Sequence, residues 1–328
     1  MMLRSATAAL TFFGVAHADT LIVGNKGEHT ISFIDLETGE EVARRETGQS
    51  PHEIAVSPDG KLAVVVSYRT QSYTGNSLHV FDVESAEKVK VIDLGESKGP
   101  HGLKWIPGTR EVIATTEVSR EVVIADIDKG EVTARIGSDQ DGTHMVALSP
   151  DAKTAYSANI GSGSFSVYDM DTREKLRDVK AGEGTEGISV SPDGAEIWVG
   201  NNNSQSVMVF DTESFEKLAE IEAEDLPIRV EMNPAGTLVA VSYPRLAQVV
   251  IFDAVTRDQI ADIALGQNGL FPVTLLWSED GTKLWAAATG SKRVVEIDAD
   301  DWSVIRTLPA GEGSDGLGYS PLDVTLTE

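Results

Sequence analysis

The sequence predicts an all-β fold, a seven-bladed β-propeller with four antiparallel strands in each blade. Three observations predict it. A turn phrase built on Ser-Pro-Asp-Gly, or a remnant of it, recurs seven times at steps of 42 to 49 residues. A second phrase, an alternating apolar run closed by Asp, also recurs seven times and is out of phase with the first. Each unit also contains four short runs of alternating apolar and polar residues, the pattern of half-buried strands.

The first phrase marks the hairpin after the first strand of each unit, because proline presets φ and glycine accepts the positive φ of a tight turn. Its copies are Ser57-Pro58-Asp59-Gly60, Pro107-Gly108, Ser149-Pro150-Asp151, Ser191-Pro192-Asp193-Gly194, Asn233-Pro234-Ala235-Gly236, Ser278-Glu279-Asp280-Gly281 and Ser320-Pro321. The second phrase closes the third strand, at Asp35, Asp82, Asp126, Asp169, Asp211, Asp253 and Asp298. Two independent markers therefore give the same number of units.

The strands themselves follow from residue type. In one unit the four runs are residues 53–57, 62–67, 78–82 and 89–94. They are rich in Val, Ile, Phe and Tyr, which favour strands. No stretch has a sustained helical period.

The two ends of the sequence predict how the ring closes. Runs at 21–24, 31–35 and 41–45 supply three strands and lack the first one of a unit. A lone first strand follows at 316–320. One blade is therefore expected to form from both ends, which closes the ring and removes its free edges.

The repeat also resembles a known family. Pro51 followed by Val56-Ser57-Pro58-Asp59-Gly60, and Val207-Met208-Val209-Phe210-Asp211 followed by Lys217, are similar to the motifs of the YVTN/YncE-like family of secreted seven-bladed propeller repeat proteins. The resemblance extends over residues 20–321 and implies a secreted propeller with a binding role. The tyrosine of the family motif is mostly replaced here, for example by Ala63-Val64-Val65.

Composition excludes several classes of function. The chain has 328 residues, 27 Lys and Arg against 52 Asp and Glu, and a net charge of −25. Such a charge opposes binding to nucleic acid or anionic lipid, so we expect neither partner. The absence of cysteine from the sequence excludes disulfides, thiolate metal sites and cysteine nucleophiles. We expect a monomer that does not insert into a membrane.

Residues 1–18 are typical of a secretory signal peptide, with Arg4, an apolar run at 6–15 and the small-x-small triplet Ala16-His17-Ala18. Cleavage would follow Ala18. The sequence therefore predicts a periplasmic protein in which residues 19–328 form a single propeller domain.

A candidate site comes from the phase of the repeat. Counting back five residues from each Ser-Pro position gives the start of the innermost strand in every blade. Around the ring these residues are His52, His101, His144, Glu186, Ile228, Val273 and Asp315. Three His and one Glu thus begin four successive inner strands, which converge on the channel. His52, His101, His144 and Glu186 are therefore predicted to meet at the channel mouth.

Three imidazoles and a carboxylate suit a divalent transition metal such as Zn²⁺ or Cu²⁺. The sequence leaves several hypotheses open. The protein could be a binding protein for a metal or a small ligand, or an enzyme (hydrolase, lyase or oxidoreductase) that uses metal-bound water with Glu186 as ligand or base. It could also be an interaction scaffold without metal, with another periplasmic protein as its partner, whose histidines only cap turns. Whether it is an enzyme stays open.

Two neighbouring features complete the expectations. The long segment 68–76 is expected to be a loop beside His52 and His101. Arg229 is expected to be a salt-bridged residue that strand alternation turns away from the channel.

Overall fold

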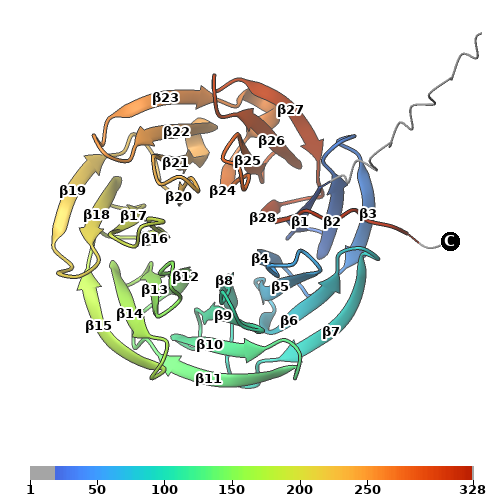
Figure 1. The fold of residues 1–328 in the computed structure, drawn as a ribbon, viewed down its shortest axis with the longest axis horizontal. Coiled ribbons are helices and arrows are strands. Elements are labelled where there is room, and N and C mark those ends of the chain that lie inside the picture. The colour runs from blue at the N-terminus through green and yellow to red at the C-terminus, as the bar shows by residue number, and fades with distance from the viewer. Residues whose placement is uncertain (1–18, 327–328) are drawn as a thin grey trace, which may run out of the picture.

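The structure is a computed structural model that describes residues 19–326. The predicted signal peptide, at residues 1–18, lies outside that range. Residues 19–326 form seven four-stranded antiparallel sheets, which stand as blades around a central channel (Figure 1). The predicted fold class, a seven-bladed β-propeller, is confirmed.

Each blade is a meander in which the first strand is innermost (Figure 1). Six blades are built from consecutive strands: β4 (Pro51–Val56), β5 (Leu62–Arg69), β6 (Thr74–Asp82) and β7 (Glu87–Asp93); β8 (Pro100–Trp105), β9 (Glu111–Thr116), β10 (Glu121–Asp126) and β11 (Glu131–Gly137); β12 (Thr143–Leu148), β13 (Thr154–Asn159), β14 (Ser164–Asp169) and β15 (Glu174–Lys180); β16 (Thr185–Val190), β17 (Glu196–Asn201), β18 (Ser206–Asp211) and β19 (Lys217–Glu222); β20 (Arg229–Met232), β21 (Leu238–Tyr243), β22 (Gln248–Asp253) and β23 (Gln259–Ala264); β24 (Pro272–Trp277), β25 (Lys283–Ala288), β26 (Arg293–Asp298) and β27 (Val304–Pro309). Two short 3₁₀ turns, η1 (Pro244–Leu246) and η2 (Gly266–Gly269), are the helical elements of residues 19–326.

The seventh blade joins the two ends of the chain, as predicted. Its strands are β28 (Ser314–Ser320), β1 (Thr20–Asn25), β2 (Thr30–Asp35) and β3 (Glu41–Glu46), in that order from the channel outward. β28 pairs with β1 in an antiparallel ladder that runs from Thr20 opposite Ser320 to Asn25 opposite Ser314. The Thr20 hydroxyl adds a 2.6 Å hydrogen bond to the carbonyl oxygen of Leu322.

The core lies between blades, where the faces of adjacent sheets pack together. One cluster joins Val64 and Leu78 of one blade to Leu103 and Val112 of the next. The outermost strands, in contrast, carry exposed apolar residues such as Val89 and Leu176. Each blade is therefore stabilised by its neighbours, and the stability of the ring depends on its closure.

Glycines allow the inner strands to approach one another closely. A Cβ atom on Gly316 would lie 1.9 Å from the carbonyl oxygen of His52, and one on Gly102 would lie 2.7 Å from that of His144. Both glycines directly follow a strand-start residue, Asp315 and His101 respectively. The missing side chains bring the strand starts of adjacent blades together at one end of the channel.

The segment 68–76 is more regular than expected. β5 extends to Arg69 and β6 already begins at Thr74, with Arg69 opposite Thr74, so the loop between them is only 70–73. Gly75 permits this extension, because a Cβ there would lie 1.8 Å from the carbonyl oxygen of Ser67. The hairpin holds Tyr68 within a strand instead of a loop.

None of the helical elements between residues 19 and 326 has the length and hydropathy that a membrane span requires.

Candidate functional site

The four predicted residues occupy equivalent places in the fold. His52, His101, His144 and Glu186 are each the second residue of an innermost strand, in β4, β8, β12 and β16. Asp315 is the second residue of β28. All five are buried at the end of the channel where these strands start.

The structure brings the three imidazoles into contact. The rings of His101 and His144 stack with centroids 3.6 Å apart and an interplanar angle of 29°. The His52 ring lies 4.8 Å from that of His101. Tyr68 packs edge-on against both, with its ring centroid 4.6 Å from His52 and 4.8 Å from His101. These four rings form one continuous cluster, here called the imidazole stack.

His144 lies between two carboxylates. Its Nδ1 is 2.8 Å from Oε2 of Glu117, and its Nε2 is 3.5 Å from Oε1 of Glu186. Burial by itself lowers the pKa of His144, but hydrogen bonds to the two carboxylates and their charges outweigh it and raise that pKa to about 9. His144 is therefore an imidazolium at neutral pH.

His101 and His52 behave in the opposite way. Burial lowers the pKa of His101 well below the usual value, and the neighbouring charge of His144 adds to this effect. Burial also lowers the pKa of His52, although Asp315 opposes it. His52 Nδ1 donates to the carbonyl oxygen of Ser50 at 3.0 Å, which fixes its tautomer and leaves Nε2 as an acceptor. Both rings are neutral at pH 7.

Buried carboxylates surround the stack, and each has a cationic partner. Glu117 accepts from the Tyr68 hydroxyl at 2.6 Å and pairs with Arg69 at 2.9 Å. Asp315 pairs with Lys26 Nζ at 2.6 Å. Burial opposes ionisation of both carboxyls, yet their partners hold the pKa of each at about 2. Both are therefore ionised throughout the physiological pH range.

Arg229 bridges the channel just below the stack. Its Nη1 is 3.1 Å from Glu186 Oε1, and its Nη2 is 2.7 Å from Oε1 of Glu53 on the opposite side. Asn202 also donates to Glu186. The expected salt bridge is present, but the guanidinium lies in the channel and does not turn away from it. The reason is that two carboxylates, on β16 and β4, face it there.

The contacts from Glu117, Lys26 and Asn202 were not anticipated from the sequence. Each of the three is the first residue after the second strand of its blade, following β9, β1 and β17. The prediction from the repeat phase covers only the starts of the first strands. The same count applied to the ends of the second strands would have found this second layer.

A cavity of about 480 Å³ opens at the channel mouth beside the stack. It is lined by Lys26, Ser50, His52, Tyr68, Arg69, Thr70 and Gln71. All seven residues have at least one polar side-chain atom, and most of these atoms are hydrogen-bond donors. We call this space the mouth cavity.

The arrangement does not support the expected Zn²⁺ or Cu²⁺ site. In the part of the chain that the structure describes, no three side chains of His, Asp or Glu are placed to hold a metal ion. His101 and His144 stack face to face, so their nitrogens do not aim at a shared centre. Both nitrogens of His144 already face carboxylates.

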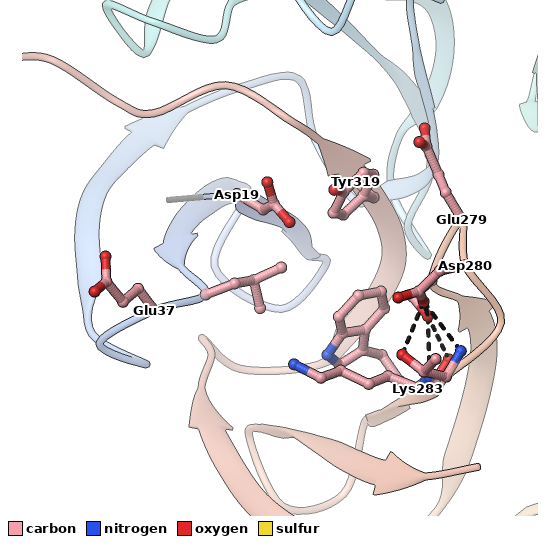
Figure 2. A pocket seen from close by; sticks show the side chains of 10 residues that line it. Asp19, Glu37, Glu279, Asp280, Lys283 and Tyr319 are labelled. Atoms are coloured by element: carbon pink, nitrogen blue, oxygen red, sulfur yellow. Dashed lines mark hydrogen bonds between the residues drawn. The ribbon is translucent and has the colours of Figure 1, made fainter. Parts of the chain in front are cut away.

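A separate cavity of about 390 Å³ lies on the opposite face, among the tight turns (Figure 2). The carboxylates of Asp19, Glu37, Glu279 and Asp280 surround it in Figure 2. Asp280 is already used within its own turn, where its Oδ1 accepts from the hydroxyl of Ser278 at 2.6 Å. Glu37, Glu279 and Asp280 are exposed surface residues.

Comparisons with known proteins support the fold more than a specific activity. Residues 108–245, fewer than half of the chain, match the model of the cytochrome D1 heme domain family. No curated protein matches. Among solved structures, the chain is similar to Kuenenia stuttgartiensis hydrazine synthase, with a TM-score of 0.76 at 21% identity over 90% of this chain and 99% of that one. It is also similar to a functionally unknown protein from Desulfotomaculum acetoxidans DSM 771, with a TM-score of 0.78 at 17% identity over 92% and 99%.

Because the matched family is a heme domain, the residues of the site are compared with what a haem would need. Of the stacked imidazoles only His144 lies within the matched residues, and both of its nitrogens face carboxylates. The mouth cavity has no aliphatic residue in its lining, and Tyr68 is its one aromatic residue apart from His52. The two faces of a macrocycle need apolar walls. The lining of the mouth cavity does not fit a haem. The comparisons identify this chain as a β-propeller similar in part to the cytochrome D1 heme domain.

Proposed function

We propose that the protein is a binding propeller that takes a small organic anion, such as a dicarboxylate, in the mouth cavity. His52 would form part of the floor beneath the ligand, and His101, His144 and Glu186 would support it from behind. The observation that carries the proposal is the donor-rich lining of a cavity whose wall includes two of the four buried rings, those of His52 and Tyr68.

Two cations at the rim support an anionic ligand. The side chains of Arg69 and Lys26 are 46% and 31% exposed; Arg69 is anchored by the partly buried Glu117 and Lys26 by the buried Asp315. A guanidinium has five N–H donors and an ammonium has three, so both retain donors for a ligand after their ion pairs are made. Anchored cations lose little side-chain entropy on binding, which favours recognition of a carboxylate.

The charge state of His144 and the ion pair of Glu186 support binding more than metal-dependent catalysis. His144 is held as an imidazolium and Glu186 is engaged by Arg229, so neither group is free to activate water. The enzyme hypothesis needed a metal on these residues, and their arrangement does not support one.

Export to the periplasm and membership of the YVTN/YncE-like family are part of the proposal. The predicted signal at residues 1–18 supports the first, and the repeated Val-Ser-Pro-Asp-Gly motif supports the second.

Titration calorimetry with succinate, inorganic phosphate and putrescine tests the proposal. We expect succinate to bind and putrescine not to bind. Arg69→Gln should weaken succinate binding about tenfold, because it removes a charge-assisted contact. The matched control is Arg120→Gln, since Arg120 follows β9 at the same end of the propeller and its side chain is 58% exposed. Failure of both anions to bind, or equal affinities in the two variants, would overturn the proposal.

A further inference from the structure

The channel contains a second cavity, of about 270 Å³, below the Arg229 bridge. We call it the lower chamber. It shares no lining residue with the mouth cavity. Glu53 and Arg229 line one end, so the ion-paired guanidinium separates the two spaces. The walls include Leu103, Met145 and Leu317, which project from the inner strands.

Small side chains on two of the inner strands widen this part of the channel, whereas larger residues occupy the same position in β8, β20 and β24. Ala55 in β4 and Gly318 in β28 line the chamber at equivalent positions, three residues after the strand-start residues His52 and Asp315. The same position carries Lys104 in β8. A propeller channel with large apolar residues at all of these positions would be filled. Apolar residues line part of the chamber, and its volume is sufficient for a small organic molecule, since a cavity of about 150 Å³ holds benzene.

The polar groups at the Arg229 end of the chamber indicate which hydrogen-bonding groups a ligand would need there. Arg229 is almost fully buried, and its Nε has no hydrogen-bond partner within residues 19–326. A buried N–H donor without an acceptor is costly, and a ligand oxygen at the Arg229 end of the chamber would supply one. Glu231 also lines the chamber, 4.0 Å from Lys104 Nζ and near enough to Arg229 to feel its charge. Its carboxyl group can therefore pair with a ligand N–H or O–H.

Charges of both signs line the chamber, which gives an ionic head group little advantage over a neutral one. The two carboxylates of Glu53 and Glu186 already neutralise Arg229. An anion would be repelled by these carboxylates, and a cation would be repelled by Arg229 and Lys104. Burial, which raises the pKa of Glu231, further reduces the charge available to attract a cation.

We propose that the lower chamber binds a small uncharged molecule with an apolar body and an amide-like head group. The head would accept from Arg229 Nε and donate to the Glu231 carboxyl, and the body would pack against Leu103, Met145 and Leu317. This site does not depend on the ligand of the mouth cavity.

Four ligands that share a phenyl ring and differ in its substituent test the proposal. Benzamide, benzoate, benzylamine and toluene are titrated into the full chain and followed by protein NMR. We expect benzamide to bind, and each of the other three to bind at least tenfold more weakly. Equal binding of all four, or no detectable binding of benzamide, would overturn the proposal; the second result would mean that Arg229 Nε is satisfied by water alone.

Two variants locate the binding. Leu276 lines the chamber and is partly exposed, so Leu276→Trp should fill the space and abolish benzamide binding. The control is Leu218→Trp, because Leu218 is 52% exposed on the outer strand β19. Glu231→Leu should weaken benzamide at least fivefold and leave toluene unaffected. Benzamide binding that survives Leu276→Trp or is insensitive to Glu231→Leu would contradict the assignment.

Discussion

His144 is the residue whose charge state defines the mouth site. A neutral His101 stacks on the imidazolium of His144, and the carboxylates of Glu117 and Glu186 face its two nitrogens. The proton is held more tightly in the folded state than in the unfolded chain, because only folding assembles this pair of carboxylates. The contacts of His144 with Glu117 and Glu186 therefore make the stability of the propeller depend on pH.

The sign of this linkage follows from the pKa of His144, which is about 9 in the folded state and about 6.5 in the unfolded state. The stabilisation is fully present below pH 6.5 and is lost as the pH rises to 9. We expect the unfolding free energy to fall by up to about 3 kcal/mol across that window. Glu117→Gln should make the fall shallower, as measured by urea denaturation at pH 6, 7.5 and 9. Parallel curves for the two proteins would show that Glu117 does not hold the proton.

The residue types and their phase predicted which side chains meet, but not how they meet. Residues at the same position of each repeat occupy the same place in each blade, so the starts of β4, β8, β12 and β16 could be aligned from the sequence by counting. Ring orientation depends on packing, and Tyr68 and Glu117 lie outside the counted positions. Those two residues hold the histidines in a stack. The three histidines and Glu186 therefore lie side by side, as predicted, but without the geometry that a metal site requires.

At the scale of the strand, the glycines that follow the strand starts determine how closely the inner strands of adjacent blades approach one another. Gly316→Ala should destabilise the protein by about 1–3 kcal/mol or more, because its Cβ would lie 1.9 Å from a backbone oxygen of β4 that cannot rotate away. The variant should also separate Asp315 from His52 and weaken succinate binding.

Gly137→Ala is the matched control for that change. Gly137 ends the outer strand β11, and the nearest atom to an added Cβ is 3.7 Å away. Its stability and succinate affinity should be close to those of the unaltered protein. Equal stabilities of the two variants in urea denaturation would contradict the role assigned to Gly316.

The strand order was predictable because turn chemistry repeats along the chain. Pro-Asp-Gly hairpins such as 58–60 and 192–194 identify the same turn in every blade. The extension of β5 and β6 beyond the expected ends was not predictable, because Arg69 and Thr74 pair only when Gly75 lets the backbone cross closely over Ser67.

For the whole molecule, closure through β28 makes the blades one cooperative unit. Deletion of residues 314–328 would remove the inner strand of one blade and expose β1, together with the cluster around Leu21, Val23 and Leu317. We expect a loss of cooperative unfolding in calorimetry and early hydrogen exchange in every blade. Exchange confined to β1, β2 and β3 would show instead that the remaining blades are stable without closure.

The central claim is that the strand starts form a binding site for an organic anion, with a stacked and metal-free histidine floor. The most direct measurement is a crystal structure of the protein grown with both succinate and Zn²⁺. The account predicts succinate in the mouth cavity, within hydrogen-bond distance of Arg69 and Lys26, above an unchanged stack of His52, His101 and His144. A zinc ion held by those three imidazoles and Glu186 would contradict it.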